Sequence, residues 1–161
     1  KGGCGIGSDR PDCFFSELVK NPDFISKYFS VVIYVQRGFS ETQLPKIDLF
    51  LGELSKHSRV IWLGPRQEPF VEIRGYVAHG CDVEVKVDES HMQELSEINK
   101  NIELRSKQKN YEFINSDSYK MPFYANCRQM NWKDTDHWSQ QGIELIAPRL
   151  NELLKPHLVK Q

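Results

Sequence analysis

The residues best suited to chemistry in this chain of 161 residues lie in one run near its C-terminus, from Asp134 to Gly142. Within the run, Asp134 precedes His137 by three residues. A neutral imidazole accepts a proton from a hydroxyl, and a carboxylate bonded to its other nitrogen fixes the tautomer and stabilises the imidazolium. In a tight turn this spacing lets the two side chains converge. We therefore predict His137 as a catalytic base and Asp134 as its orienting acid, the alternative being a solvated loop that caps the last helix.

Neighbouring side chains could belong to the same site. Trp138 either forms a wall of the site or is part of the core. Gln36 and Arg37 directly follow an apolar run, where the Arg37 guanidinium could orient a substrate or an oxyanion, or could form a structural ion pair. Asp136 adjoins His137, but adjacent side chains diverge, so we interpret it as a surface carboxylate.

Metal and cofactor chemistry find no support in the sequence. The combination of His79, Cys81 and Asp82 lacks the ligand spacing of a zinc site, so no metal and no cofactor are expected. The glycine-rich run from Gly3 to Ser8 follows no strand, so it predicts neither a phosphate-binding loop nor an activated serine. A nucleophile that His137 could activate is therefore not found in the chain.

Strands and helices alternate along the sequence. Apolar β-branched runs predict strands at residues 30–35, 59–63 and 111–115, with a weaker edge strand at 83–87. Helical periodicity predicts helices at residues 14–19 and 41–57, and a last one with Ser139 as its N-cap. A long polar helix capped by Asp88 or Ser90 is also predicted, with an apolar face of Met92, Leu95, Ile98 and Ile102. This alternation is typical of a parallel α/β sheet.

The burial pattern of these elements can also be predicted. The strands at 30–35 and 59–63 are unbroken apolar runs, which predicts inner strands buried on both faces. The apolar face of the second helix is predicted to contain Leu44, Ile47, Leu51 and Leu54. The last helix is predicted to turn inward Ile143, Ile146, Ala147, Leu150, Leu153 and Leu154.

Ligands of parallel sheets bind beyond the carboxyl ends of the strands. Those positions are Gln36 to Gly38, Gly64 to Arg66 and the residues after Asn115. Three confident strands are few for a doubly wound sheet, so a further strand is expected.

Composition excludes several classes of partner. With 21 basic and 22 acidic side chains the formal net charge is -1, so no nucleic-acid partner is expected. The longest apolar runs are strand-sized, far below the roughly 20 residues that cross a bilayer. Four cysteines without a Cys-x-x-Cys pair favour disulfides in an oxidising compartment over zinc or free cytosolic thiols. They allow three complete pairings, and the candidate bridges are Cys4–Cys13 and Cys81–Cys127.

The order of these pieces resembles the SGNH hydrolase domain. The resemblance is carried by a strand that ends in Gln36-Arg37, a strand that ends in Gly64-Pro65, and the block Asp134 to Ser139 followed by a glycine. It is closest to the domain attached to integral-membrane acyltransferases that O-acetylate bacterial surface polysaccharides. It covers about residues 30–150, and the last block is its most specific part.

By this resemblance His137 would be the catalytic base, Asp134 its orienting acid, and Arg37 a neighbour of the acyl-binding site. The resemblance also implies a three-layer αβα, flavodoxin-like sheet in a single domain over residues 1–161. The family's first block, a strand followed by Gly-Asp-Ser, supplies the nucleophile and an oxyanion-hole amide, and it has no counterpart here. We expect that block upstream of Lys1, the alternative being a degenerate relative that has lost its serine.

The expected function is therefore acyl transfer, with acetyl as the expected group, to or from a glycan through a Ser-His-Asp triad. The expected partners are a glycan acceptor, an acyl donor and a membrane-embedded acyltransferase domain of the same polypeptide. The expected location is periplasmic or otherwise extracytoplasmic, tethered to the inner membrane through an N-terminal region. The alternative function is a non-catalytic glycan-binding or scaffold domain with a degenerate SGNH fold.

Overall fold

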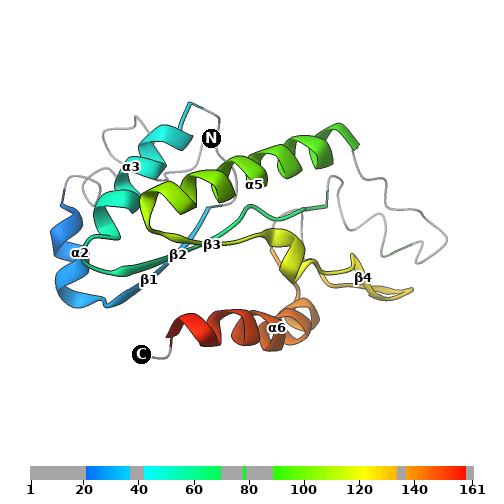
Figure 1. Ribbon diagram of the computed structural model, residues 1–161. Helices are drawn as coiled ribbons and strands as arrows, with labels where there is room; N and C mark the ends of the chain where they lie inside the picture. The colour runs from blue at the N-terminus through cyan, green and yellow to red at the C-terminus, as the bar shows by residue number, and fades with distance from the viewer. Residues whose placement is uncertain (1–20, 37–41, 70–77, 79–88, 134–136, 159–161) are drawn as a thin grey trace. The chain divides into compact units, whose positions relative to one another are not determined.

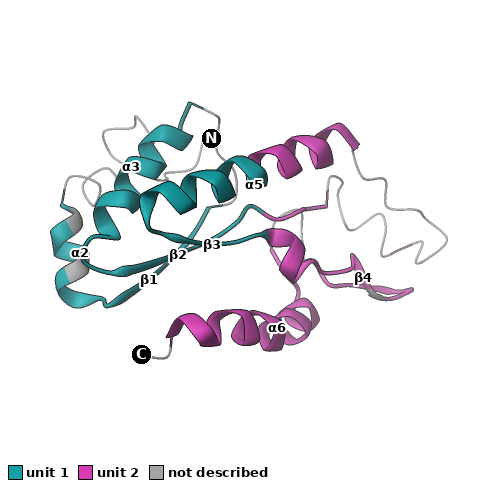
Figure 2. Cartoon of the chain, viewed as in Figure 1, with its two compact units in different colours: residues 1–65, 99–115 teal, residues 66–98, 116–161 magenta. Residues whose placement is uncertain are grey.

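The computed structural model describes residues 21–36, 42–69, 78, 89–133 and 137–158, and these have an α/β fold (Figure 1). In chain order the elements are α2 (Pro22–Tyr28), β1 (Val31–Val35), α3 (Leu44–Leu54), β2 (Arg59–Leu63), α5 (Glu89–Lys109), β3 (Glu112–Ile114), η2 (Ser116–Tyr119), β4 (Tyr124–Asn126), β5 (Gln129–Met130) and α6 (Gln140–Leu158). They fall into two compact units (Figure 2). Unit 1 comprises residues 1–65 and 99–115, and unit 2 comprises residues 66–98 and 116–161. Helix α5 contributes to both units.

Unit 1 contains a parallel sheet with the strand order β1-β2-β3. Strand β1 pairs with β2 along its whole length, and the C-terminal part of β2 pairs with β3. The central strand is the buried one, because the residues from Val60 to Leu63 are at most 8% exposed. The three main strand predictions are confirmed, with β1 and β3 slightly shorter than predicted.

Strand β1 corrects one of these predictions, because it is an edge of the described sheet and not an inner strand. Among the described strands it has β2 as its neighbour. Ile33 and Val35 are 42% and 54% exposed. The apolar run predicted burial on both faces because parallel strands are normally covered on both sides. In the described chain that apolar surface stays open to solvent.

Trp62 of β2 is the centre of an aromatic core in unit 1. Its ring lies edge-on to Tyr34 of β1, with 5.3 Å between ring centroids, and edge-on to Phe113 of β3, at 6.4 Å. Tyr111, just before β3, tilts against it at 5.9 Å. Edge-to-face contacts of this kind stabilise a core beyond the area that they bury. They connect all three strands through one side chain.

Helix α3 and the C-terminal part of α5 lie over one face of this sheet (Figure 1). The predicted apolar face of α3 is confirmed, since its members are all buried, namely Leu44, Ile47, Leu51 and Leu54. In α5 the predicted Ile102 is fully buried. Asp48 of α3 is 3% exposed, accepts a hydrogen bond from the Tyr111 hydroxyl at 2.7 Å and forms an ion pair with Arg105 of α5 at 2.6 Å. This carboxylate therefore ties α3 to α5 and to the start of β3.

Gly64 follows β2 at a place where a side chain does not fit. A Cβ atom there would lie 2.5 Å from Oδ1 of Asn99 and 2.9 Å from the Phe113 ring. Asn99 is itself buried, and its Nδ2 donates to the carbonyl of Pro65 at 3.3 Å. The Gly-Pro pair at this strand end is thus explained by close packing against α5.

Unit 2 contains structure where the sequence predicted a loop over 116–138. The 3-10 helix η2 is followed by an antiparallel pair, β4 and β5, in which Tyr124 is opposite Met130. Met130 and Trp132 form a buried cluster against which partly buried side chains pack, namely Met121, Phe123, Tyr124 and Trp138. The loop prediction was wrong because strands of two or three residues are too short to show a periodic pattern.

Helix α6 is confirmed, but its inward face is only partly as predicted. Ile146 is buried, and Leu150, Leu153 and Leu154 are partly buried. Ile143 is 45% exposed and Ala147 is exposed, so these two predictions were wrong. The buried stripe starts from Gly142, four residues before Ile146, which turns Ile143 outward.

Some predictions lie outside the described residues. These are the helix at 14–19, the strand at 83–87, and Cys4, Cys13 and Cys81. Cys127, in the turn between β4 and β5, is disulfide-bonded. Among the residues that the structure describes, no helix has the length and apolar content needed to cross a bilayer.

Candidate functional site

The backbone of His137 and Trp138 is paired with that of Lys133 and Trp132. An antiparallel bridge pairs Trp132 with Trp138, and the N–H of Lys133 donates to the carbonyl of His137 at 2.7 Å. The two indole rings meet edge to face, with 6.2 Å between their centroids. We call this pairing of Trp132 with Trp138 the tryptophan bridge. The His137 side chain is exposed, so a fixed backbone presents an accessible imidazole.

The N-terminus of α6 anchors the chain directly after Trp138. Ser139 is the N-cap, as predicted, because its Oγ accepts a hydrogen bond from the N–H of Gly142 at 3.1 Å. The same hydroxyl donates to the carbonyl of Met130 at 3.0 Å. The Ser139 N–H donates to the carbonyl of Asn131 at 2.8 Å. One serine therefore caps α6 and ties it to β5 and the residue that follows.

Gly142 allows the first turn of α6 to lie directly on the chain at Asn131. A Cβ atom at Gly142 would lie 2.0 Å from the Asn131 carbonyl oxygen, closer than any real contact. Asn131 is 1% exposed, and its Nδ2 donates to the carbonyl of Pro122 at 2.7 Å. The glycine that follows the Asp134 to Ser139 block is thus required by packing and not by a turn.

Arg66 contacts both rings of the tryptophan bridge. Its guanidinium carbon lies 4.4 Å from the centroid of the Trp138 ring and 5.4 Å from that of Trp132. Both distances are within cation–π range. The guanidinium also pairs with Glu68, with 3.8 Å between Nη2 and Oε1, and the two side chains are 26% and 15% exposed. Arg66 is the third residue after β2, one of the strand-end positions from which a ligand contact was predicted.

Tyr119 of η2 is within the electrostatic reach of the Arg66 charge. Burial raises the pKa of Tyr119 to about 12, and the positive charge of Arg66 partly opposes that rise. Its hydroxyl therefore stays protonated at physiological pH. Tyr119 is 5% exposed. A buried neutral phenol and a stacked guanidinium thus share the neighbourhood of the tryptophan bridge.

The predicted site residues are only partly within the described chain. His137 and Trp138 are described in unit 2, and Gln36 is described in unit 1. Asp134 and Arg37 lie outside the described residues. Trp138 was predicted either as core or as a wall of the site. Its ring is partly buried and is covered by Arg66, which does not decide between the two.

Gln36 has an oriented side chain. Its Oε1 accepts a hydrogen bond from the Tyr34 hydroxyl. Burial raises the pKa of Tyr34, which keeps this hydroxyl protonated and therefore able to donate.

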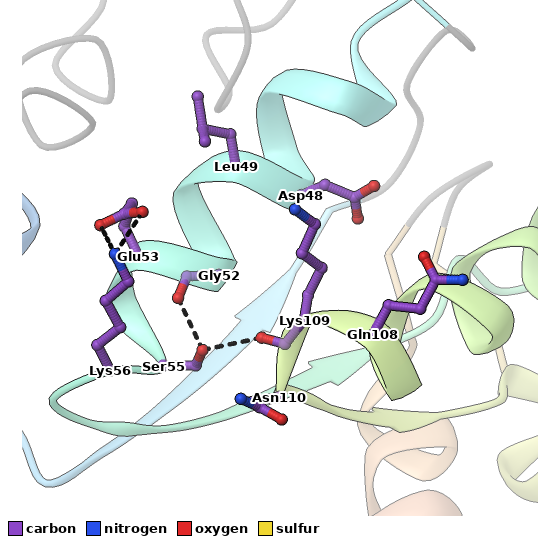
Figure 3. Close-up of a pocket in the computed structure, with 9 residues that line it drawn as sticks. All are labelled: Asp48, Leu49, Gly52, Glu53, Ser55, Lys56, Gln108, Lys109 and Asn110. Atoms are coloured by element: carbon purple, nitrogen blue, oxygen red, sulfur yellow. Dashed lines mark hydrogen bonds and ion pairs between the residues drawn. The ribbon is translucent and has the colours of Figure 1, made fainter.

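A separate polar pocket of about 210 Å³ lies in unit 1 between the C-terminal ends of α3 and α5 (Figure 3). Its lining residues bond largely to one another. Lys56 pairs with Glu53 at 2.6 Å, and the Ser55 hydroxyl lies 2.8 Å from the Gly52 carbonyl and 3.0 Å from the Lys109 carbonyl (Figure 3). None of the predicted site residues lines this pocket. The Ser55 hydroxyl, at the end of α3, contacts the last residue of α5 and so connects the two helix ends. The side chains that line the pocket are not arranged as in a typical catalytic site.

His79, Cys81 and Asp82, which were not predicted to form a metal site, lie outside the described residues. In the described ranges, no group of three or more His, Cys, Asp and Glu side chains could hold a metal ion.

Arg66 was predicted only as a strand-end position, and its contact with the tryptophans was missed. No local pattern signals that contact, because Arg66 and Trp132 are far apart in sequence.

Comparisons with known proteins found no relative of this chain. No family model, no curated protein and no solved structure matches the chain. The candidate site therefore rests on its own geometry and chemistry.

Proposed function

We propose that this chain carries the base and the orienting acid of a serine acyltransferase or esterase of the SGNH type, acting on a glycan outside the cytoplasm. His137 is the base, Asp134 is its acid, and Trp138 borders the acyl site. The serine comes from a strand and Gly-Asp-Ser turn upstream of Lys1, and the sheet takes the three-layer, flavodoxin-like arrangement.

The chemistry needs few groups. The serine Oγ attacks the acyl carbonyl carbon while His137 takes its proton, and backbone amides stabilise the oxyanion. The leaving group departs with the proton that His137 returns. A sugar hydroxyl or a water molecule then attacks the acyl-serine with His137 as base again, which releases the acylated glycan or the free acid.

The observation that carries this proposal is the position of His137. Its imidazole is exposed, while its carbonyl accepts a hydrogen bond from Lys133 and the next two residues of the chain are held by the tryptophan bridge and by the Ser139 cap. Catalytic bases need such a combination of access and rigid placement, because misplacement by about 1 Å can cost roughly 100-fold in rate. A solvated capping loop has no need of it.

Strand β1 supports the expectation of a further strand. A parallel sheet is normally covered on both faces, yet Ile33 and Val35 of the edge strand β1 are exposed. A strand paired along β1, with the helix that follows it, would cover this apolar surface. That is the place where an upstream nucleophile block could join the sheet.

The disulfide at Cys127 supports placement in an oxidising compartment. A free Cys127 thiol in protein isolated under non-reducing conditions, measured by alkylation and mass spectrometry, would count against this part of the proposal.

The direct test is hydrolysis of p-nitrophenyl acetate by the full-length protein and by its His137→Ala variant. Loss of general base catalysis is expected to lower the rate by about 100-fold to 10,000-fold. His57→Ala is a matched control, since His57 is an exposed histidine of unit 1 and its loss is expected to leave the rate unchanged. Equal rates for His137→Ala and the wild type would contradict the proposal and favour a non-catalytic glycan-binding domain.

A further inference from the structure

The guanidinium of Arg66, in unit 2, lies against two aromatic rings. Arg66 has both a carboxylate partner in Glu68 and two tryptophan faces, and its side chain is 26% exposed. A guanidinium suits this position, since it is planar, always charged and weakly hydrated, and stacks on aromatic faces. Cation–π contacts that are partly desolvated are among the stronger ones.

The two rings that Arg66 contacts belong to residues whose backbone is paired next to His137. Trp138 is bonded to His137 in the chain, and Trp132 precedes Lys133, whose N–H holds the His137 carbonyl. A force that keeps the two indole rings together therefore also restrains the chain at His137. Ser139, the residue after Trp138, restrains the chain through its hydrogen bonds with Met130 and Gly142.

We propose that Arg66 is a positioning residue for His137: its guanidinium, stacked on the rings of Trp132 and Trp138, fixes the tryptophan bridge and with it the backbone that presents the imidazole. The catalytic half of this inference rests on the proposed function, because it concerns the rate of the reaction that His137 is proposed to catalyse. The structural half concerns the bridge alone.

The test compares Arg66→Met, Arg66→Lys and the wild type in the full-length protein. Methionine keeps the apolar stem of arginine and removes the charge, whereas lysine keeps the charge and loses the planar stack. Arg128→Met is the matched control, because Arg128 is an exposed arginine in the same unit, in the turn between β4 and β5. Far-UV circular dichroism verifies that each variant is folded. If Arg66→Met does not fold, the comparison of Arg66→Lys with the wild type decides the test.

The first readout is NMR spectroscopy of the indole N–H signals and the His137 backbone amide. In Arg66→Met the signals of Trp132, Trp138 and His137 are expected to shift, while that of Trp62 in unit 1 stays in place as an internal reference. Arg66→Lys is expected to show a smaller shift of the same signals, and Arg128→Met none. Unchanged signals for both tryptophans in Arg66→Met would overturn the inference.

The second readout is steady-state hydrolysis of p-nitrophenyl acetate. We expect kcat of Arg66→Met to fall by roughly tenfold with KM almost unchanged, because misplaced groups lower the rate and not the binding. Arg66→Lys is expected to recover part of kcat. An unchanged kcat together with shifted bridge signals would overturn the catalytic half. If the wild type has no activity but the signals respond as expected, the proposed function fails and the positioning of the bridge stands.

Discussion

The guanidinium carbon of Arg66 lies 4.4 Å from the centroid of the Trp138 ring, on the residue directly after His137. Arg66 is the third residue after β2, and its contact is with the chain neighbour of the candidate base. Ligand sites of parallel sheets are built from such strand-end segments. The contact is therefore the structural reason to consider Arg66 together with His137.

Gly142 is expected to tolerate no side chain. In Gly142→Ala the new methyl group would meet the Asn131 carbonyl oxygen, so the start of α6 must move. We expect a loss of about 2 kcal/mol in the free energy of unfolding, the typical cost of overpacking. Urea denaturation followed by circular dichroism measures it.

Gly52→Ala is the matched control for this prediction. Gly52 is within α3, and a Cβ atom there would make ordinary contact with the Lys109 side chain at 3.6 Å. Replacing a helical glycine by alanine is expected to stabilise the protein by about 0.5 to 1 kcal/mol. A Gly142→Ala variant as stable as Gly52→Ala would refute the close packing of α6 on Asn131.

Asp48 is expected to be a major stabilising residue of unit 1. In Asp48→Ala, Tyr111 loses a buried hydrogen bond and Arg105 loses its ion pair. Because Arg105 is 44% exposed, we expect a loss of about 2 to 3 kcal/mol, below the full cost of breaking a buried pair. Chemical denaturation of Asp48→Ala and Glu103→Ala provides the comparison.

Glu103 serves as the control because its ion pair with Lys107 is exposed along α5. Its removal is expected to cost less than about 1 kcal/mol. Equal losses for the two variants would show that Asp48 does not tie α3 to α5 and β3.

Alkaline pH is expected to weaken the fold through Tyr119. The unfolded chain releases this phenol proton near the ordinary pKa of 10.0, whereas burial raises the pKa in the folded protein to about 12. The contribution of Tyr119 is therefore fully present below pH 10 and is lost as the pH rises from 10 to 12. Denaturation of the wild type and of Tyr119→Phe at pH 8 and pH 11 measures this loss.

Tyr119→Phe is expected to show a smaller decrease in stability between these pH values than the wild type. Tyr28→Phe is the control, since Tyr28 is 61% exposed, and it is expected to follow the wild type. Identical pH dependence in Tyr119→Phe and the wild type would show that Tyr119 makes no such contribution.

Much of the fold could be predicted because the long elements carry a periodic signal. The periodic apolar residues of α3 predicted a helix with one buried face, and the unbroken apolar run of β2 predicted a buried strand. The edge position of β1 could not be predicted, since its apolar run has the same appearance as that of a covered strand. The exposure of Ile143 could not be predicted either, because it depends on the contact of Gly142 with Asn131, two residues without an apolar side chain.

The site follows the same division. The Ser139 cap could be predicted from a short run of residue types, since a capping hydroxyl before an apolar periodic segment has a local signature, whereas the role of His137 stays a prediction. The tryptophan bridge and the stacking of Arg66 could not, because both depend on tertiary contacts between short or distant segments.

The most direct test of the central claim is labelling of the full-length protein with a fluorophosphonate, a reagent that modifies activated serines. Mass spectrometry of the wild type is expected to find one labelled serine, in a Gly-Asp-Ser sequence upstream of Lys1. The label is expected to be lost in His137→Ala and retained in His57→Ala. The absence of a labelled serine in the wild type, or equal labelling of His137→Ala, would contradict the assignment of His137 as the base of a serine triad.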